Sequence, residues 1–233
     1  MAGWVGADIW FAALYSYRIP DTSPSYAPCS PLPSPAAVRL ALVDAVIRHT
    51  GSMEEGRHMF DRVRSAPLEL QPPGLVSVMK FFLKRLKPQK PEKGTRPSVI
   101  ESTGVREYCL PSGPITAWVQ TDQPATIAQA FGWLRRLGTT DSIAWCTPVS
   151  GAPDPHLCMR AIDTLPLNLQ NFSRRVVITL HELVSEATFD QINPFQGGQK
   201  RANPFHKRLY MLPLVIEKAG ENWVRYRREP FQT

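Results

Sequence analysis

The feature that most constrains the fold of this 233-residue chain is a proline-rich segment that leads directly into a helix. Within eight residues the chain has prolines at positions 28, 31, 33 and 35. Proline fixes φ, lacks a backbone N–H and disfavours helix in the residue before it, so this segment must be extended. Ser34 occupies a helix N-cap position, and Pro35 takes the first helical position, where its missing N–H costs nothing. The sequence therefore predicts a helix start with a fixed direction.

The residues after Pro35 have the pattern of an amphipathic helix. Apolar residues recur there at helical spacing, at Val38, Leu42, Ala45 and Val46. We expect a helix over 35–49 that ends at Gly51, with Arg39 on the side opposite much of the apolar stripe. The free N–H groups and partial positive charge of such a helix start suit a phosphate group. A turn followed by an ordinary core helix is the alternative interpretation.

Composition narrows the classes of protein that fit. Hydrophobic residues make up 43% of the chain and no apolar run reaches membrane-spanning length, so we expect a cytoplasmic globular protein with no membrane partner. The net charge of +7 favours a polyanionic partner. The four cysteines are scattered and form no CxxC pair, which argues against a disulfide framework or zinc site. His181 and Glu182 begin like a zincin helix, but Ser185 stands where the second histidine must be, so no metal or cofactor is predicted.

The order of predicted elements indicates an α+β fold. Strands are expected over 5–19, 75–86, 142–149 and, in two pieces, 105–120, and helices over 35–49, 53–64 and 126–137 with Gly138 as the last helix's C-cap. With the helix over 53–64 set aside, the order is strand, helix, strand, strand, helix, strand. This is the split βαβ, or ferredoxin-like (RRM-like), pattern, which we assign to residues 1–150. A linker over 148–155 then leads to a smaller β-rich C-terminal region over 151–233, in which strands are expected over 174–184 and 208–217.

Two segments concentrate positive charge. In the first, prolines alternate with cations at Lys84, Arg85, Lys87, Lys90, Lys93 and Arg96, which predicts a mobile basic loop without a packed core. The second, over 193–208, repeats Asn-Pro-Phe and contains Gly197-Gly198 and cationic side chains. Its backbone and cations could hold RNA phosphates while Phe195 or Phe205 stacks on a base. The equally weighted alternative is a solvated loop whose phenylalanines enter the core.

Two stretches of the sequence form recognisable motifs. One is Pro-Leu-Pro-Ser-Pro-x-x-Val-Arg-x-x-Leu, from Pro31. The other is Trp133-Leu-Arg-Arg-Leu-Gly138, followed by Thr-Thr-Asp-Ser-Ile. Both resemble the CRISPR-associated RAMP superfamily, and more narrowly the family of Cascade subunits that cap the 5′ handle of the guide RNA, in which a glycine is usual where this chain has Leu40. The resemblance covers residues 3–150, and it places the basic insertion, over about 84–114, where that family carries a thumb.

The resemblance implies a non-catalytic subunit of a type I CRISPR Cascade complex in antiviral defence, which binds the 5′ handle of the crRNA. Its implied partners are the crRNA, the repeating backbone subunit, the large subunit and, within the complex, target DNA. The residues that we expect to bind RNA are cationic, aromatic or at the helix start: Tyr17, Arg18, Ser34, Arg39, Lys84, Arg85, Lys87, Arg106, Tyr108, Lys200, Arg201, His206, Lys207 and Arg208.

A second function from another class fits the same superfamily: a metal-independent endoribonuclease that processes CRISPR repeat RNA. That chemistry needs a general base, often histidine, near a cation that stabilises the developing phosphorane charge. His49 and His206 are the candidates, and neither has a persuasive partner in the sequence. We therefore favour the binding function and name no catalytic residue.

Overall fold

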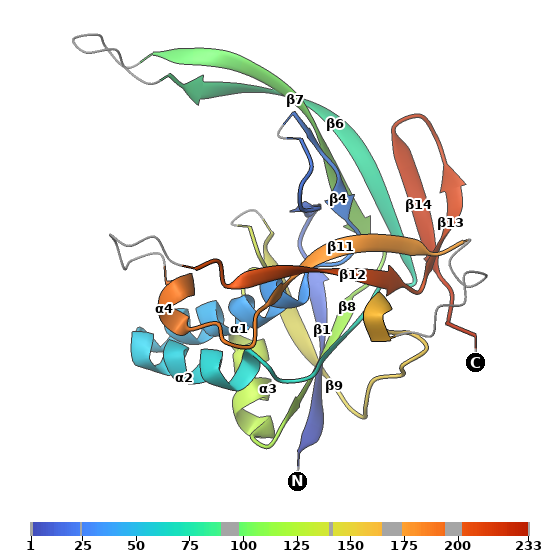
Figure 1. Ribbon diagram of the computed structural model, residues 1–233. Helices are drawn as coiled ribbons and strands as arrows, with labels where there is room; N and C mark the ends of the chain where they lie inside the picture. Colours follow the sequence, from blue (N-terminus) through green and yellow to red (C-terminus); the bar gives the residue numbers. More distant parts are fainter. Residues whose placement is uncertain are drawn as a thin grey trace.

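The chain forms an α+β fold, in which the first helices lie beside a four-stranded antiparallel sheet (Figure 1). The computed structural model describes residues 2–23, 25–89, 98–139, 142–164, 174–193 and 202–232. The sheet has the strand order β5-β8-β1-β9, with β1 at Gly3–Phe11, β5 at Leu68–Gln71, β8 at Ile115–Thr121 and β9 at Ala144–Val149. Strand β1 ends at Phe11, earlier than the predicted strand over 5–19, because the chain turns there towards the proline segment.

Helix α1 (Pro35–Thr50) confirms the predicted helix start. The Ser34 hydroxyl accepts a hydrogen bond from the Ala37 N–H at 3.1 Å, and Gly51 ends the helix at φ 70°. Helix α2 (Met53–Val63) follows and packs against α1. Both helices were predicted within two residues of their observed bounds, because caps and apolar spacing agree there.

Helix α3 (Pro124–Trp133) is shorter than predicted, and Gly138 is not its C-cap. Leu134 is already extended, and the Ala144 N–H donates to the Arg135 carbonyl at 3.0 Å. Backbone pairing with the start of β9 therefore replaces the last helical turn. Gly138 instead has φ +75° in the turn that follows, where an added Cβ would lie 2.7 Å from the Tyr17 ring.

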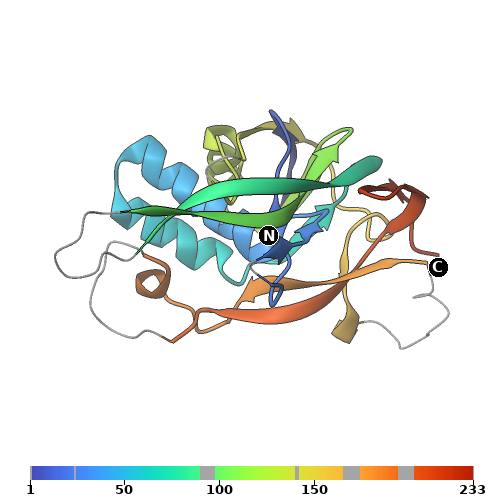
Figure 2. The same ribbon diagram turned by 90° about the horizontal axis from the view of Figure 1, so that it is seen from above.

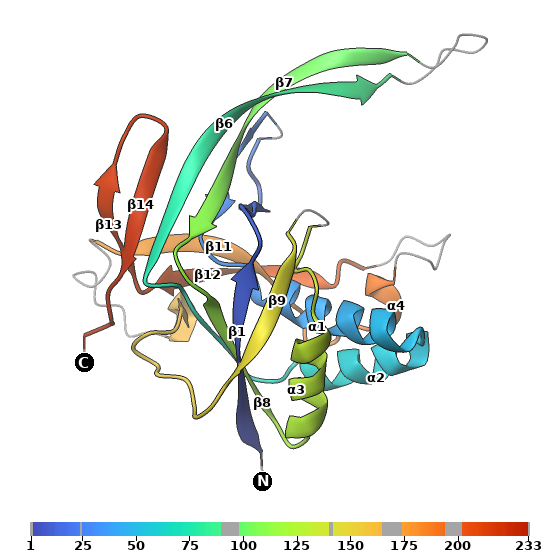
Figure 3. The same ribbon diagram turned by 180° about the vertical axis from the view of Figure 1, so that it is seen from behind.

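A long hairpin of β6 (Leu75–Pro88) and β7 (Val99–Pro111) arches away from the body (Figures 1 and 3). The expectation of a loop from Lys84 is wrong as far as Pro88, because ladder pairing with β7 continues to the Pro88–Val99 pair. The predicted cations Lys90, Lys93 and Arg96 lie outside the described residues. The hairpin belongs to a five-stranded sheet of order β13-β14-β6-β7-β3, with β3 at Tyr26–Ala27, β13 at Leu214–Ala219 and β14 at Trp223–Arg228.

The C-terminal region adds strands to this sheet and forms a second, smaller one. Its three-stranded sheet has β12 (Phe205–Leu212) between β10 (Arg160–Ala161) and β11 (Val176–Leu183), and β11 packs against α1. The predicted strand over 208–217 is two strands, because Pro213 interrupts it. The short elements are β2 (Tyr17–Arg18), β4 (Cys29–Ser30), the 3₁₀ turn Ile162–Thr164 and α4 (Phe189–Ile192).

Seen from above, the β6–β7 hairpin and the β11–β12 pair lie on opposite sides of the segment that contains β2, β3 and β4 (Figure 2). No helix among the described residues is long and apolar enough to cross a membrane. The described part of the chain also brings together no group of three His, Cys, Asp or Glu side chains that could hold a metal ion.

Candidate nucleic-acid interface

Three hollows form a continuous groove from the middle and outer part of the β6–β7 hairpin, at 83–87 and 102–106, to the start of α1. The first, of about 260 Å³, is lined by Arg18, Lys87 and Arg106 among others. Arg18 and Arg106 also line the second, of about 220 Å³, together with Ser34 and His181. Ser34 and His181 in turn line the third, of about 450 Å³, beside α1. Because neighbouring hollows share residues, we treat them as one surface, the basic groove.

The first two hollows of the basic groove are positive because their cations are not neutralised. Arg18 Nε donates to the Thr22 hydroxyl at 3.0 Å, which is an uncharged partner. Within the described residues, none of Arg18, Lys87 and Arg106 forms an ion pair. All three were predicted RNA-binding residues, and they come from β2, β6 and β7. Strands that are distant in sequence therefore direct three free cations to one surface that an anion can reach.

Three other predicted cations are engaged with acids. Lys84 lies 2.9 Å from Glu101 across the hairpin, and Lys207 lies 2.5 Å from Asp21. Arg208 contacts Asp163 at 2.8 Å, and this hydrogen-bonded guanidinium lowers the pKa of the Asp163 carboxyl. None of these cations lines the basic groove.

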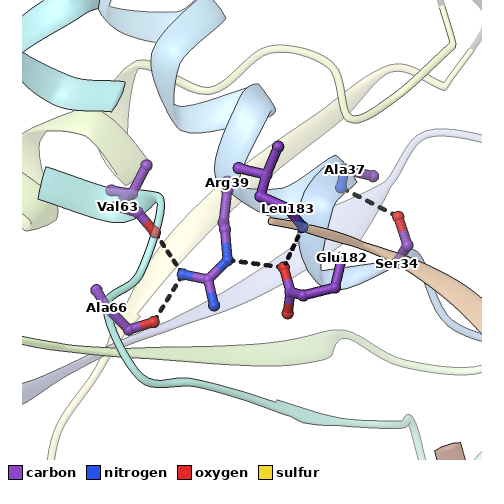
Figure 4. Close-up of polar contacts among 7 residues, drawn as sticks. All are labelled: Ser34, Ala37, Arg39, Val63, Ala66, Glu182 and Leu183. Carbon is purple, nitrogen blue, oxygen red and sulfur yellow. Dashed lines mark hydrogen bonds and ion pairs between the residues drawn. The ribbon is translucent and has the colours of Figure 1, made fainter. Parts of the chain in front are cut away.

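Arg39 does not face away from the apolar stripe, and this expectation is wrong (Figure 4). Its side chain is 8% exposed, and its Nε donates to Glu182 Oε1 at 3.2 Å. One terminal nitrogen donates to the carbonyl of Ala66 at 2.6 Å and to that of Val63. Arg39 therefore ties α1 to the end of α2 and to β11, and its guanidinium is not presented to a phosphate in the groove.

The predicted aromatic residues, Tyr17 and Tyr108, are buried or half-buried and contact other parts of the protein. Tyr17 is buried, and its hydroxyl donates to the Leu137 carbonyl at 2.9 Å, so it forms part of the groove floor rather than a free stacking ring. Tyr108 is half-buried on β7 and meets Phe81 edge-on at 5.4 Å between ring centroids. Neither ring is therefore free to stack on a base without giving up a contact inside the protein.

The remaining predicted residues divide into three groups. Ser34 caps α1 and lines the groove, as described above. His206 is exposed on β12 and lines none of the three hollows. Lys200 and Arg201 lie outside the described residues, as does Phe195, and of Arg85 only the backbone is described.

Sequence reasoning missed His181, which lines two of the three hollows. Burial, and secondarily the charge of Lys207, lower the pKa of His181. The sequence was searched at His181 only for a zinc motif, although the predicted strand over 174–184, which β11 confirms, contains this residue. The other nuclease candidate, His49, stacks on Trp133 at 3.9 Å between ring centroids and lines none of the three hollows.

Comparison with known proteins identifies the family. No family model matches the chain. The chain is 34% identical over 224 residues to CRISPR-associated protein Cas5 of Archaeoglobus fulgidus, covering 94% of this chain and 96% of that protein. The chain belongs to the Cas5 family. This membership confirms the resemblance to CRISPR-associated proteins that the proline-rich helix start and the Trp133–Gly138 stretch indicated.

Two solved structures align with this Cas5 family member over nearly its whole length. A crystal structure of a CRISPR protein from Archaeoglobus fulgidus covers 98% of this chain and 92% of its own, at 11% identity and a TM-score of 0.37. A chain of a CRISPR RNA-guided surveillance complex covers 97% of this chain and 90% of its own, at 13% identity and a TM-score of 0.34. The family assignment rests on the sequence identity to Cas5.

Proposed function

We propose that this Cas5 family member binds the 5′ handle of crRNA as a non-catalytic subunit of a type I Cascade complex. The observation that carries the proposal is the basic groove, where Arg18, Lys87 and Arg106 converge without acidic partners among the described residues. Cations that neutralise phosphates supply most of the sequence-independent affinity for a nucleic acid. A narrow groove lined by backbone and cations suits a single strand, whose bases can turn away from the phosphates.

The strand order supports a ferredoxin-like, RRM-like core for this function. Helices α1 and α2 connect β1 to β5, and α3 connects β8 to β9, in a sheet of order β5-β8-β1-β9. This is the order expected of the split βαβ pattern. The β6–β7 hairpin is inserted between β5 and β8, and it supplies Lys87 and Arg106 to the groove. It contains part of the thumb predicted over about 84–114 and also the strand over 75–86, which was predicted for the core sheet and is replaced there by β5. The division into a core over 1–150 and a β-rich region over 151–233 is part of the same proposal.

One face of the hairpin, which bears Phe82, is the basis for proposing that other protein subunits contact this protein. Phe82 is 71% exposed, Leu86 67% and Val99 59%, and all three lie on one face of β6 and β7. Lys84, which pairs with Glu101, lies between Phe82 and Leu86 on this face. Exposed apolar side chains bordered by polar residues in this way mark interaction sites. We therefore propose that the backbone and large subunits of Cascade contact this protein, with the target DNA held elsewhere in the complex.

The test compares free cations with paired ones. In one variant Arg18, Lys87 and Arg106 become glutamine; in the control, Lys84, Lys207 and Arg208 become glutamine. We expect the slope of log K against log[salt] for repeat-derived handle RNA to fall by roughly 2 in the first variant, at about 0.7 per lost phosphate contact. The control should change this slope much less, because its cations are already neutralised.

The same binding reactions, run without divalent metal, also test the endoribonuclease alternative. Intact RNA after incubation supports the binding function, whereas a discrete cleavage product would support the nuclease. A salt slope that stays the same when the three groove cations are removed would place the RNA on another surface.

A further inference from the structure

The third hollow of the groove differs from the first two because its walls are mainly apolar. One wall is the first two turns of α1, with Ala36, Ala37 and Leu40. The other wall carries His181 of β11 and Phe205 of β12, whose ring centroids are 5.9 Å apart at an interplanar angle of 46°. The hollow, of about 450 Å³, is thus large enough for a planar heterocycle and offers it two rings on one side.

His181 is available for recognition. Within the described residues its ring makes no hydrogen bond, although the side chain is partly buried. Burial, and then the charge of Lys207, lower its pKa, with Asp21 acting weakly in the opposite direction. The ring is therefore neutral at pH 7, with one nitrogen that donates and one that accepts a hydrogen bond. Such a pair of groups can match the edge of a nucleobase.

The charged residues at the hollow argue against a phosphate as its occupant. Arg136 lines it, but its guanidinium donates to both carboxylate oxygens of Asp44 at 3.1 Å. A phosphate placed here would meet a neutralised cation and the Asp44 carboxylate. An uncharged aromatic ring meets no such opposition, and stacking of a base on an aromatic side chain is favourable for every base.

We propose that the hollow between α1 and the β11–β12 pair is a nucleobase pocket, in which Phe205 stacks on one unstacked RNA base and His181 hydrogen-bonds to its edge. This inference rests on the proposed function. The pocket continues from the basic groove through Ser34 and His181, next to the positions of Arg18 and Arg106. Phosphates held by those arginines would lead one flanking base directly to the pocket. The groove would thereby combine phosphate contacts that position the RNA with one contact that specifies its sequence.

The experiment scans the handle for the base that occupies the pocket. Repeat-derived handle RNA, and a series in which each oligonucleotide carries one abasic ribose, are titrated against the full-length protein. In the wild type we expect one position where loss of the base weakens binding roughly tenfold, the size of one stacking contact. In Leu40→Trp, which fills the pocket, intact RNA should bind roughly tenfold more weakly, and the abasic effect at that position should disappear.

A second variant keeps the test independent of any misfolding caused by the larger side chain. His181→Ala should reduce discrimination among the four bases at that position, while the salt slope stays unchanged. His58→Ala is the matched control, because His58 lies on α2 and lines none of the three hollows.

The outcomes separate the pocket from the function on which it rests. If handle RNA binds with the expected salt slope but no position depends on Leu40 or His181, the pocket is wrong and the binding function stands. If handle RNA binds no better than unrelated RNA, and the groove cations do not affect it, both are wrong. If the abasic effect persists in Leu40→Trp, the base is bound elsewhere.

Discussion

The environment of Arg39 and the basic groove use the same residue type for opposite purposes. Arg39 lies in the first turns of α1, enclosed by two backbone carbonyls and the carboxylate of Glu182. Arg18 of β2 and Arg106 of β7 line the same hollow and have no acidic partner in the described part of the chain. The difference teaches that position beside a helix start does not make an arginine a ligand contact. An arginine can contact a ligand phosphate only if no acidic group of the protein already neutralises it.

The two environments also differ in how much stability is lost when their cations are removed. A buried charge that loses its partner keeps its desolvation penalty without compensation, so removal of one partner is strongly destabilising. A cation in an open groove is solvated, and its loss changes stability little. Stability and RNA affinity should therefore respond to different arginines.

The largest expected effect is on stability, from Arg39→Ala. We expect the free energy of unfolding to fall by about 3 kcal/mol, because Glu182, whose side chain is 13% exposed, loses its cation and two carbonyls lose their donor. Urea unfolding followed by circular dichroism measures this loss. RNA affinity per folded molecule should stay unchanged.

The double variant Arg39→Met, Glu182→Gln is the control for this prediction, since it removes both charges together. It should recover much of the lost stability. A fall in RNA affinity for correctly folded Arg39→Ala would overturn the comparison and return Arg39 to the binding site.

The next effect concerns Ser34, which caps the helix that carries Arg39 and also lines the groove. Ser34→Ala should lower the free energy of unfolding by about 1 kcal/mol, through loss of the hydrogen bond from the Ala37 N–H. Ser34→Asp keeps a good cap, so it should keep stability, yet it adds a negative charge to the groove. We expect Ser34→Asp to weaken handle binding at low salt. Equal affinity of Ser34→Asp and wild type would show that the RNA does not pass the start of α1.

The sequence predicted local structure well where several signals agreed. At α1, proline, an N-cap serine, apolar spacing and a terminal glycine all point to the same helix, and its start is as predicted. At α3 the apolar spacing extended beyond the helix, because Leu134 and Leu137 are buried in the turn that pairs with β9 rather than in another helical turn. Backbone pairing across the chain has no local sequence signal.

The sequence predicted which residue types form the candidate site, but it did not predict which of the candidate cations line the groove. Lys84 and Lys87 were both expected in a loop, but strand β6 extends through them, so their side chains lie on opposite faces: Lys84 meets Glu101 and Lys87 lines the groove. Ion pairs such as Lys207 with Asp21 join residues far apart in the chain, so no spacing rule could find them. His181 lines the groove because β11 packs on α1, and this contact joins segments that are far apart in the sequence.

A smaller effect is expected from the matched pair Lys84 and Lys87, three residues apart on β6. Lys87→Met should lower the salt slope of RNA binding by roughly 0.7, the value for one phosphate on a single strand. Lys84→Met should change the slope less, and it should cost well under about 1 kcal/mol of stability because its pair with Glu101 is exposed. Fluorescence anisotropy at several salt concentrations measures both variants. Equal slopes would show that the ion pair does not distinguish these lysines.

The smallest effect is the contribution of His181 to the pH dependence of stability. Its pKa in the folded protein lies below the ordinary 6.5, so between that lowered pKa and about 6.5 the unfolded chain binds more protons than the folded one. Stability from this group is thus complete above about pH 6.5 and is lost as the pH falls through the folded pKa. The loss should be smaller than that of the Ser34 cap, because the ring is only partly buried.

Urea unfolding of the wild type and His181→Gln between about pH 5 and pH 8 measures the contribution of His181. Glutamine does not titrate, so the variant should lose less stability than the wild type when the pH is lowered. The other histidines titrate in both proteins, and their contribution cancels in the difference. A pH dependence that is the same in both proteins would mean that the environment of His181 does not favour the neutral ring. His181 would then have to read its base as a protonated donor at the low end of this range.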